Sequence, residues 1–108
     1  MAISVARLGQ KVTISVQGQL AGADQVELRR VIDEQLAQNV TEFLVDFADA
    51  TYIDSRGLGG LVAASKKVRE RGARIRLENL NGELRQLFRL TRLDEIFDLG
   101  TDGGPRVA

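Results

Sequence analysis

The 108-residue sequence predicts a single α/β domain, with a mixed sheet of four or five strands and three to four helices. Two observations support this prediction. Stretches that alternate apolar and polar residues, as strands do, are interleaved with stretches whose apolar residues recur every three or four positions, as in helices. Residues 43–47 are apolar nearly throughout, which is typical of a strand buried on both faces.

The first two predicted elements are strands at residues 3–8 and 11–17. In the second strand, three β-branched apolar residues alternate with polar ones, the period of a strand with one exposed face. Gly9 and Gln10 between the strands make a connection short enough for a hairpin. Residues 18–22 then form a predicted loop.

The first helix is predicted at residues 24–38. Asp24 stands at its start, and Glu27 follows three residues later, the spacing of a capping box. Asn39 is expected to end the helix. Four apolar residues fall on one face and are expected to be buried: Leu28, Val31, Ile32 and Leu36.

The centre of the chain predicts a strand, a helix and a second strand. The first strand is residues 43–47, followed by a loop at residues 48–54. The helix is predicted at residues 55–71, where Gly72 ends it in the left-handed conformation. The second strand is residues 74–78. A strand, a helix and a strand in this order form a crossover, so the two strands are expected to be parallel.

The last part of the chain predicts a third helix after residues 79–82, containing Leu84, Leu87 and Phe88. Leu93, Ile96 and Phe97 are expected to pack as a final short helix or strand. Residues 101–108 hold the only proline and are predicted to be a flexible tail. The predicted domain is therefore residues 1–100.

Composition argues against several classes of function. The chain has 15 basic and 15 acidic residues, so no net field attracts it to nucleic acid or to an anionic membrane. The absence of cysteine and histidine removes thiolate chemistry, the commonest general base and the usual zinc ligands. No apolar run is long enough to cross a bilayer, and the start has no signal-peptide pattern. We expect a cytoplasmic protein without metal or cofactor, without a nucleic-acid partner and without membrane insertion.

The basic residues of the chain's second half are interpreted as a solvated face. They are Lys66, Lys67, Arg69, Arg71, Arg74 and Arg76. Glu70 and Glu78 interrupt the run, as is usual on exposed helices and strands. The pattern favours solvent exposure over nucleic-acid binding.

Ser55 follows the predicted central strand and opens a helix, the place where open α/β sheets bind ligands. As a helix cap, a serine contributes about 1 kcal/mol. A cap does not account for Gly57, Gly59 and Gly60, each of which costs about 1 kcal/mol inside a helix. These glycines indicate either the close approach of another surface or tight packing of the helix on the sheet.

Enzyme chemistry at Ser55 is disfavoured. A nucleophilic serine needs a positioned base. Lys66 and Lys67 lie roughly 16 Å further along the helix, too far to serve. The glycines match a dinucleotide fingerprint only in part, and no GxxxxGK[ST] motif occurs in the chain. We expect no catalytic residues.

The remaining role for Ser55 is to accept a phosphoryl group. Such a group adds about −1.5 to −2 charges, and the amino terminus of a helix tolerates them. The carboxylate of Asp54 would sharpen the repulsion of an approaching partner. A surface of small residues with one serine is therefore suited to a switch, because it is flat when unmodified and strongly anionic when modified.

Residues 45–47 and 52–61, which read VDF and YIDSRGLGGL, resemble the hallmark of STAS domains, the bacterial anti-sigma factor antagonists. Three further segments resemble the family: residues 18–20, 71–77 and 84–99. The resemblance covers about residues 3–99, and its Asp-Ser-x-Gly-Leu element is fairly specific for the fold.

The resemblance implies a partner-switching mechanism. In this family the unphosphorylated protein binds an anti-sigma factor, often a serine kinase of the ATPase type. Phosphorylation of the serine that matches Ser55 separates the two proteins, and a phosphatase resets the switch. The protein is then a ligand and a substrate, not an enzyme. The implied contact residues are Leu20, Ala21, Gly22, Asp54, Ser55, Arg56, Gly57, Leu58 and Gly59.

Two positions depart from the family pattern. Ala21 stands where an acidic residue is usual, and Arg56 stands where the family has a small residue. The guanidinium of Arg56 would pair with a phosphate on Ser55 or with an acidic partner. Two alternatives stay open: a constitutive STAS adaptor or regulatory subunit of a transporter or larger complex, and a nucleotide-binding STAS domain.

Overall fold

The computed structural model describes residues 3–95 and residue 97. Its strands are β1 (Ile3–Leu8), β2 (Lys11–Leu20), β3 (Glu42–Ile53) and β4 (Arg74–Glu78). Its helices are α1 (Asp24–Ala37), α2 (Ser55–Glu70) and α3 (Gly82–Leu90), followed by the short 3₁₀ helix η1 (Leu93–Glu95).

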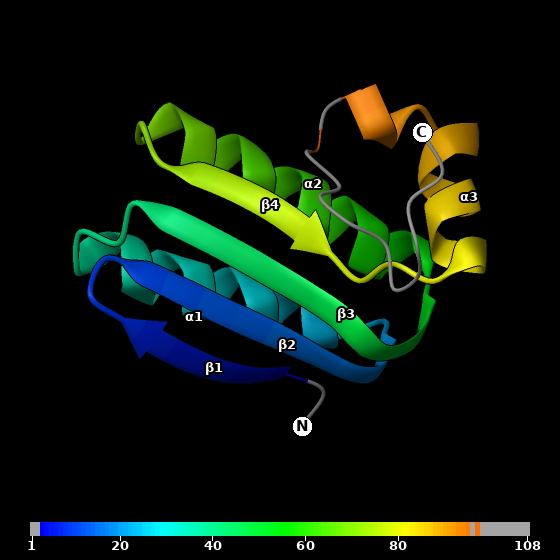
Figure 1. Cartoon of the computed structure of the whole chain (residues 1–108), viewed down its shortest axis with the longest axis horizontal. Helices are drawn as coiled ribbons and strands as arrows, with labels where there is room; N and C mark the ends of the chain where they lie inside the picture. The colour runs from blue at the N-terminus through cyan, green and yellow to red at the C-terminus, as the bar shows by residue number, and fades with distance from the viewer. Residues whose placement is uncertain (1–2, 96, 98–108) are drawn as a thin grey trace.

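The four strands form one mixed sheet in the order β1-β2-β3-β4 (Figure 1). β1 is antiparallel to β2, as the short hairpin predicts, and β2, β3 and β4 run parallel to one another. The predicted crossover through α2 is confirmed, because β3 and β4 are parallel neighbours. Parallel strands end at the same edge of a sheet, so the ends of β2 and β3 lie together.

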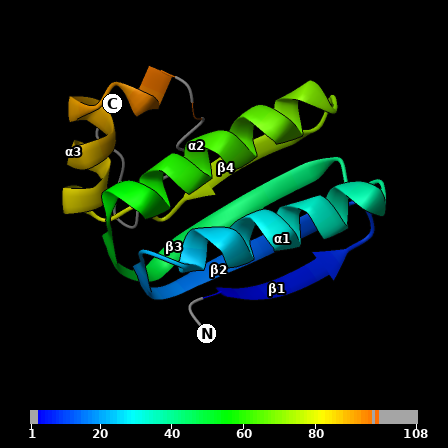
Figure 2. The same cartoon turned by 180° about the vertical axis from the view of Figure 1, so that it is seen from behind.

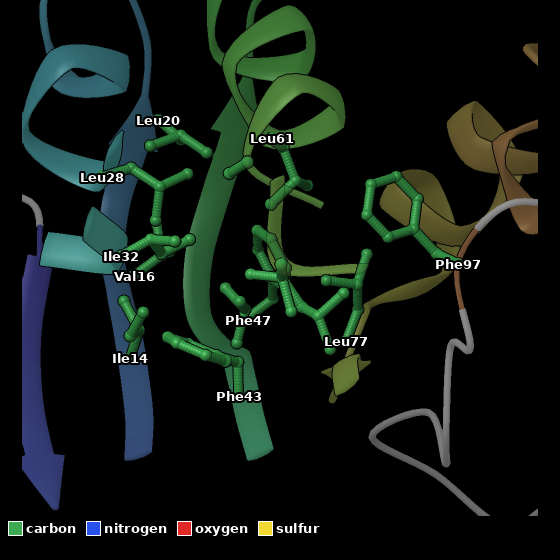
Figure 3. Close-up of a cluster of buried hydrophobic side chains, with 14 of the residues drawn as sticks. Ile14, Val16, Leu20, Leu28, Ile32, Phe43, Phe47, Leu61, Leu77 and Phe97 are labelled. Atoms are coloured by element: carbon green, nitrogen blue, oxygen red, sulfur yellow. The ribbon is translucent and has the colours of Figure 1, made fainter. Parts of the chain in front are cut away.

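The sheet and the two long helices make two layers. α1 and α2 lie side by side on one face of the sheet, in front of it in Figure 2 and behind it in Figure 1. Apolar side chains from both layers meet between them (Figure 3). The buried cluster includes Ile14, Val16, Leu20, Leu28, Ile32, Phe43, Phe47, Leu61 and Leu77. All four residues of the predicted α1 face are buried.

α3 and η1 lie beyond the carboxyl end of β4 (Figure 1). The ring of Phe88 on α3 meets that of Phe97 edge to face, with centroids 5.8 Å apart. This contact joins the end of the described chain to the core, and η1 accounts for the short last element that was expected. Ile96 and the predicted tail at residues 101–108 lie outside the described residues.

The predicted loop at residues 48–54 is wrong, because β3 continues to Ile53. The predicted loop at residues 18–22 is too long, because β2 extends to Leu20. The two strands keep pairing, with register shifts between Ser15 and Gln17 and between Gly18 and Gln19. Buried positions in the second half of β3 are therefore three residues apart. The alternation that marks a strand in a sequence is lost there.

Three of the predicted helix ends can be compared with the structure. Asn39 and Gly72 adopt the left-handed conformation with φ of 64° and 75°, as predicted for residues that end helices. The capping box at Asp24 is wrong. Asp24 is already inside α1, and its Oδ2 accepts a hydrogen bond from the Ala21 N–H at 3.1 Å instead.

Candidate functional site

The candidate site lies where β2 and β3 end and α2 begins. Residues 21–23 connect β2 to α1, and Asp54 connects β3 to α2. The Asp54 N–H donates to the Leu20 carbonyl oxygen at 3.2 Å, which holds the ends of the two strands together. The parallel pairing of β2 with β3 thus brings two loops together that are more than thirty residues apart in sequence.

Asp54 is the residue that joins these two loops. Its Oδ1 accepts the Gly57 N–H at 2.7 Å, the bond of an N-cap, and its Oδ2 accepts the Gly22 N–H at 3.1 Å. The Gly57 hydrogen bond, helped by the Gly22 N–H and the Arg56 guanidinium, lowers the pKa of Asp54 below its ordinary value. Asp54 is therefore ionised at neutral pH, and its two oxygens hold the 21–23 loop against the start of α2.

Ser55 is not the cap of α2, which corrects the first interpretation of this residue. Asp54 is the N-cap, and Ser55 is the first residue of the helix. The Ser55 side chain is exposed, and its hydroxyl has no hydrogen-bond partner within the part of the chain that the structure describes. The hydroxyl is therefore accessible for modification, and its removal leaves the cap intact.

The three glycines of α2 have different explanations. A Cβ on Gly57 would lie 2.0 Å from the Leu20 carbonyl oxygen, and a Cβ on Gly60 would lie 2.5 Å from the Gln25 Cβ. These two glycines let α2 pack closely against the end of β2 and the start of α1. A Cβ on Gly59 would meet nothing within 4 Å. Of these three glycines, only Gly59 lies on an open surface.

The predicted contact residues divide into a buried and an accessible set. Leu20 and Gly57 are buried, and they pack against each other under the exposed residues of the site. Ala21, Gly22, Asp54 and Leu58 are partly exposed, whereas Ser55, Arg56 and Gly59 are exposed. We call the exposed and partly exposed residues the α2-start surface. Apart from Asp54 and Arg56, it carries no charged side chain.

Two exposed apolar residues lie close in sequence to this surface, and the sequence analysis did not single them out. Tyr52, at the end of β3, is 52% exposed, and Val26, in the first turn of α1, is 60% exposed. The contact of Gln25 with Gly60 brings the first turn of α1 against the second turn of α2. Val26 lies off the apolar face of α1, and Tyr52 fell in a predicted loop. The sequence offered one sign that these two residues are exposed: each is an apolar residue that does not fit the predicted core pattern.

No metal-binding group of three or more acidic, cysteine or histidine residues is found in the region that the structure describes. Asp46, an acidic residue in the first half of β3, has a structural role. Its Oδ1 accepts from the Ala48 N–H and from the Asn79 side-chain amide, both at 2.9 Å. Among the described residues, no helix is long and apolar enough to span a membrane.

Sequence comparison identifies the class of protein that has this fold and site. A family model described as "Mlab, STAS domain" matches residues 3–100. The chain belongs to the STAS domain family. It is 34% identical over 94 residues to the anti-sigma-B factor antagonist of Bacillus subtilis, an alignment that covers 82% of this chain and 86% of the relative.

Solved structures show the same fold. The protein TM1081 of Thermotoga maritima superposes with a TM-score of 0.83 at 22% identity, covering 91% of this chain and 79% of that chain. The anti-sigma factor antagonist SpoIIAA in its unphosphorylated form gives a TM-score of 0.71 at 20% identity, covering 88% and 97%. Bacillus SpoIIAA in its phosphorylated form gives 0.73 at 20% identity, covering 94% of both chains.

Proposed function

We propose that this protein is an anti-sigma factor antagonist, a non-enzymatic binding protein that Ser55 phosphorylation switches off. One observation carries the proposal: Ser55 presents an exposed hydroxyl without a hydrogen-bond partner among the described residues, and Asp54 rather than Ser55 caps the helix. The name of the Bacillus subtilis relative supports the same role. The proposed partner is an anti-sigma factor of the ATPase type that is also a serine kinase, and a phosphatase restores the unmodified form. The cytoplasm is the proposed compartment.

The geometry gives a physical reason why a phosphate would disrupt binding. The Gly57 N–H already donates to the Asp54 carboxylate, and the Leu58 N–H donates to the Asp54 carbonyl oxygen at 2.9 Å. A phosphate on Ser55 therefore finds these first-turn amides occupied. Its charge of about −1.5 to −2 would stand on the surface beside an ionised carboxylate. A partner that binds the unmodified surface would meet this added charge directly.

The site of modification is tested with the cognate kinase and ATP, followed by mass spectrometry of the intact protein. We expect wild type to gain a single phosphate and Ser55→Ala to gain none. Ser65→Ala is the matched control, because Ser65 lies on the same helix but is fully buried, and it should be labelled like wild type. Labelling of Ser55→Ala, or no labelling of wild type, would contradict the proposed switch.

The electrostatic explanation is tested by comparing Ser55→Asp with Ser55→Asn. The two side chains have nearly the same shape, and only one is charged. We expect Ser55→Asp to keep the fold and to bind the anti-sigma factor about tenfold more weakly or worse, since a like charge at an interface is costly. Ser55→Asn should bind close to wild type. Isothermal titration calorimetry measures both, and equal affinities would reject the charge-based mechanism.

A second candidate, the constitutive adaptor, is favoured by one observation: the exposed Arg56 side chain directly follows Ser55. A guanidinium there would obstruct a kinase that expects a small residue. If this is correct, wild type stays unlabelled while Arg56→Ala becomes a substrate. Labelling of wild type and Arg56→Ala at similar rates would exclude obstruction and leave the first candidate.

A further inference from the structure

The two edge strands of the sheet, β1 and β4, differ in how well they are protected against pairing with a further strand (Figure 1). Each pairs with one neighbour in the described sheet, so half of its backbone N–H and C=O groups point outward. β4 has only five residues, and three of them are charged: Arg74, Arg76 and Glu78. A short strand with charged side chains is a poor template for another strand. The β4 edge is therefore protected by its own sequence.

β1 has little of this protection. It has six residues and no proline, and its register with β2 runs from Ile3 to Leu8 without a bulge. Its one charged residue is Arg7. The Arg7 Nε donates to the Gly9 carbonyl oxygen at 2.9 Å, and the Arg7 guanidinium also donates to the side-chain oxygen of Gln38 at the end of α1. Arg7 is thus held against its own hairpin and helix, and it does not guard the edge.

The other exposed side chains of β1 are small or apolar. Ser4 and Ala6 are exposed, and Leu8 is 87% exposed. Val5 pairs with Ile14, which is fully buried, so Val5 continues the apolar layer between the sheet and the helices out to the edge. There it is still 43% exposed. A strand placed along this edge would cover Val5 and use the outward N–H and C=O groups.

A second copy of the chain is the occupant that these features favour. Two β1 strands that pair antiparallel are related by a two-fold axis, so one surface serves both copies. The central positions for this axis are Val5 and Ala6. Arg7 then faces Ile3 of the second copy in the first case and Val5 in the second, so no like charges meet. The formal net charge of the chain is zero, so no net repulsion opposes self-association.

We propose that β1 pairs antiparallel with β1 of a second copy of this chain, which joins the two four-stranded sheets into one continuous sheet. The helices of both copies then lie on the same face. A six-residue strand is about 20 Å long. The contact therefore belongs to the small interfaces, below about 1,200 Å², and the dimer is weak and reversible.

The dimer leaves the α2-start surface of each copy accessible. That surface lies where β2 and β3 end, and β1 contributes no residue to it. Because the two β1 strands run in opposite directions, the two surfaces lie at opposite ends of the joined sheet. The dimer would therefore present two binding sites to two partner molecules. The proposal does not depend on Ser55 phosphorylation, so the two proposals fail separately.

The oligomeric state is tested by sedimentation equilibrium of the full chain from about 10 µM to about 1 mM. We expect the average mass to rise with concentration from that of one chain toward that of two. Ser55→Ala should behave in the same way, because Ser55 is far from β1 in the sheet. A constant monomer mass up to about 1 mM would overturn the proposal and leave the edge to a strand of another protein.

The edge itself is tested with Val5→Lys, which places a charge where the two copies would meet. We expect this variant to stay monomeric at concentrations where wild type dimerises. Val26→Lys is the matched control, because it makes the same substitution at a 60% exposed position on α1 and changes the net charge equally. It should dimerise like wild type, and circular dichroism shows whether each variant is folded. Equal dimerisation of the two variants would reject the β1 interface.

A cross-linking test decides the geometry and does not need a charged variant to fold. The chain has no cysteine, so a single introduced cysteine can be oxidised only with its own copy. A residue on the two-fold axis faces itself with Cβ atoms about 4.5–5.5 Å apart, close to the spacing of a disulfide. We expect either Val5→Cys or Ala6→Cys to form a linked dimer in high yield, which identifies the axis. If neither exceeded the yield of Val26→Cys, antiparallel β1 pairing would be wrong.

Discussion

The two ends of α2 are stabilised by different kinds of interaction. At its start, the backbone of α2 packs directly on Leu20, and both oxygens of Asp54 accept backbone N–H groups. The second half of α2 buries Ala64, Ser65 and Val68, and it adds an exposed ion pair to α1, in which the Lys67 Nζ lies 2.7 Å from the Asp33 Oδ1. The start of α2 tolerates little change in shape. At the other end, the exposed ion pair of Lys67 with Asp33 is expected to tolerate change.

The largest effect is expected from Gly57→Ala. The added Cβ would lie 2.0 Å from a backbone oxygen, and neither backbone can move without displacing β2 or α2. Overpacking in a core typically costs about 1–3 kcal/mol, and a clash with backbone belongs at or above the top of that range. Urea unfolding followed by circular dichroism measures the loss.

Gly59→Ala is the control for this prediction. Nothing lies within 4 Å of its Cβ position, and alanine is the better helix former. We expect the free energy of unfolding to stay the same or to rise by up to about 1 kcal/mol. If both variants were equally stable, α2 would not be packed on Leu20 as described.

The second effect in size is expected from Asp54→Asn. The amide keeps the shape of the carboxylate but loses its charge, which weakens the bonds to the Gly57 and Gly22 N–H groups. We expect a lower melting temperature than wild type, with a smaller loss of stability than in Gly57→Ala. Amide hydrogen exchange at Gly22 should quicken, because the 21–23 loop loses its anchor.

The same carboxylate predicts a pH dependence. The folded-state pKa of Asp54 is below its ordinary value of 3.8, so its contribution to stability is fully present above that pH. The contribution is lost as the pH falls from 3.8 through the folded-state pKa. Wild type and Asp54→Asn should therefore converge in melting temperature below that range. A constant difference between them from neutral to acid pH would contradict this assignment.

The smallest effect on stability is expected near the end of α2, from Lys67→Gln. Its side chain and that of Asp33 are 48% and 47% exposed, and such pairs contribute about 0–1 kcal/mol. Stability should change by no more than this amount, and the difference should shrink in added salt. A loss as large as that of Gly57→Ala would mean that this exposed ion pair stabilises α2 as strongly as the backbone packing at the start of the helix does.

Most of the element order was predictable because local pattern and tertiary role agree. β1, β4 and the buried face of α1 follow directly from apolar periodicity, and Asn39 and Gly72 end their helices as expected. The second half of β3 was missed because register shifts against β2 remove the alternation. The helix cap was assigned to Ser55 because both it and Asp54 are good caps, and only the backbone path distinguishes them.

The sequence by itself determined the α/β class, the family hallmark around Ser55 and the absence of histidine and cysteine chemistry. These properties depend on residue identity and on spacing along the chain. Only the tertiary structure decided that Gly57 and Gly60 serve internal packing whereas Gly59 is open. It also decided that Asp54 anchors a loop from another part of the chain, and that Lys11, Glu42 and Arg74 form one row across three strands. The physical reason is the register of parallel strands, which brings distant residues within contact distance.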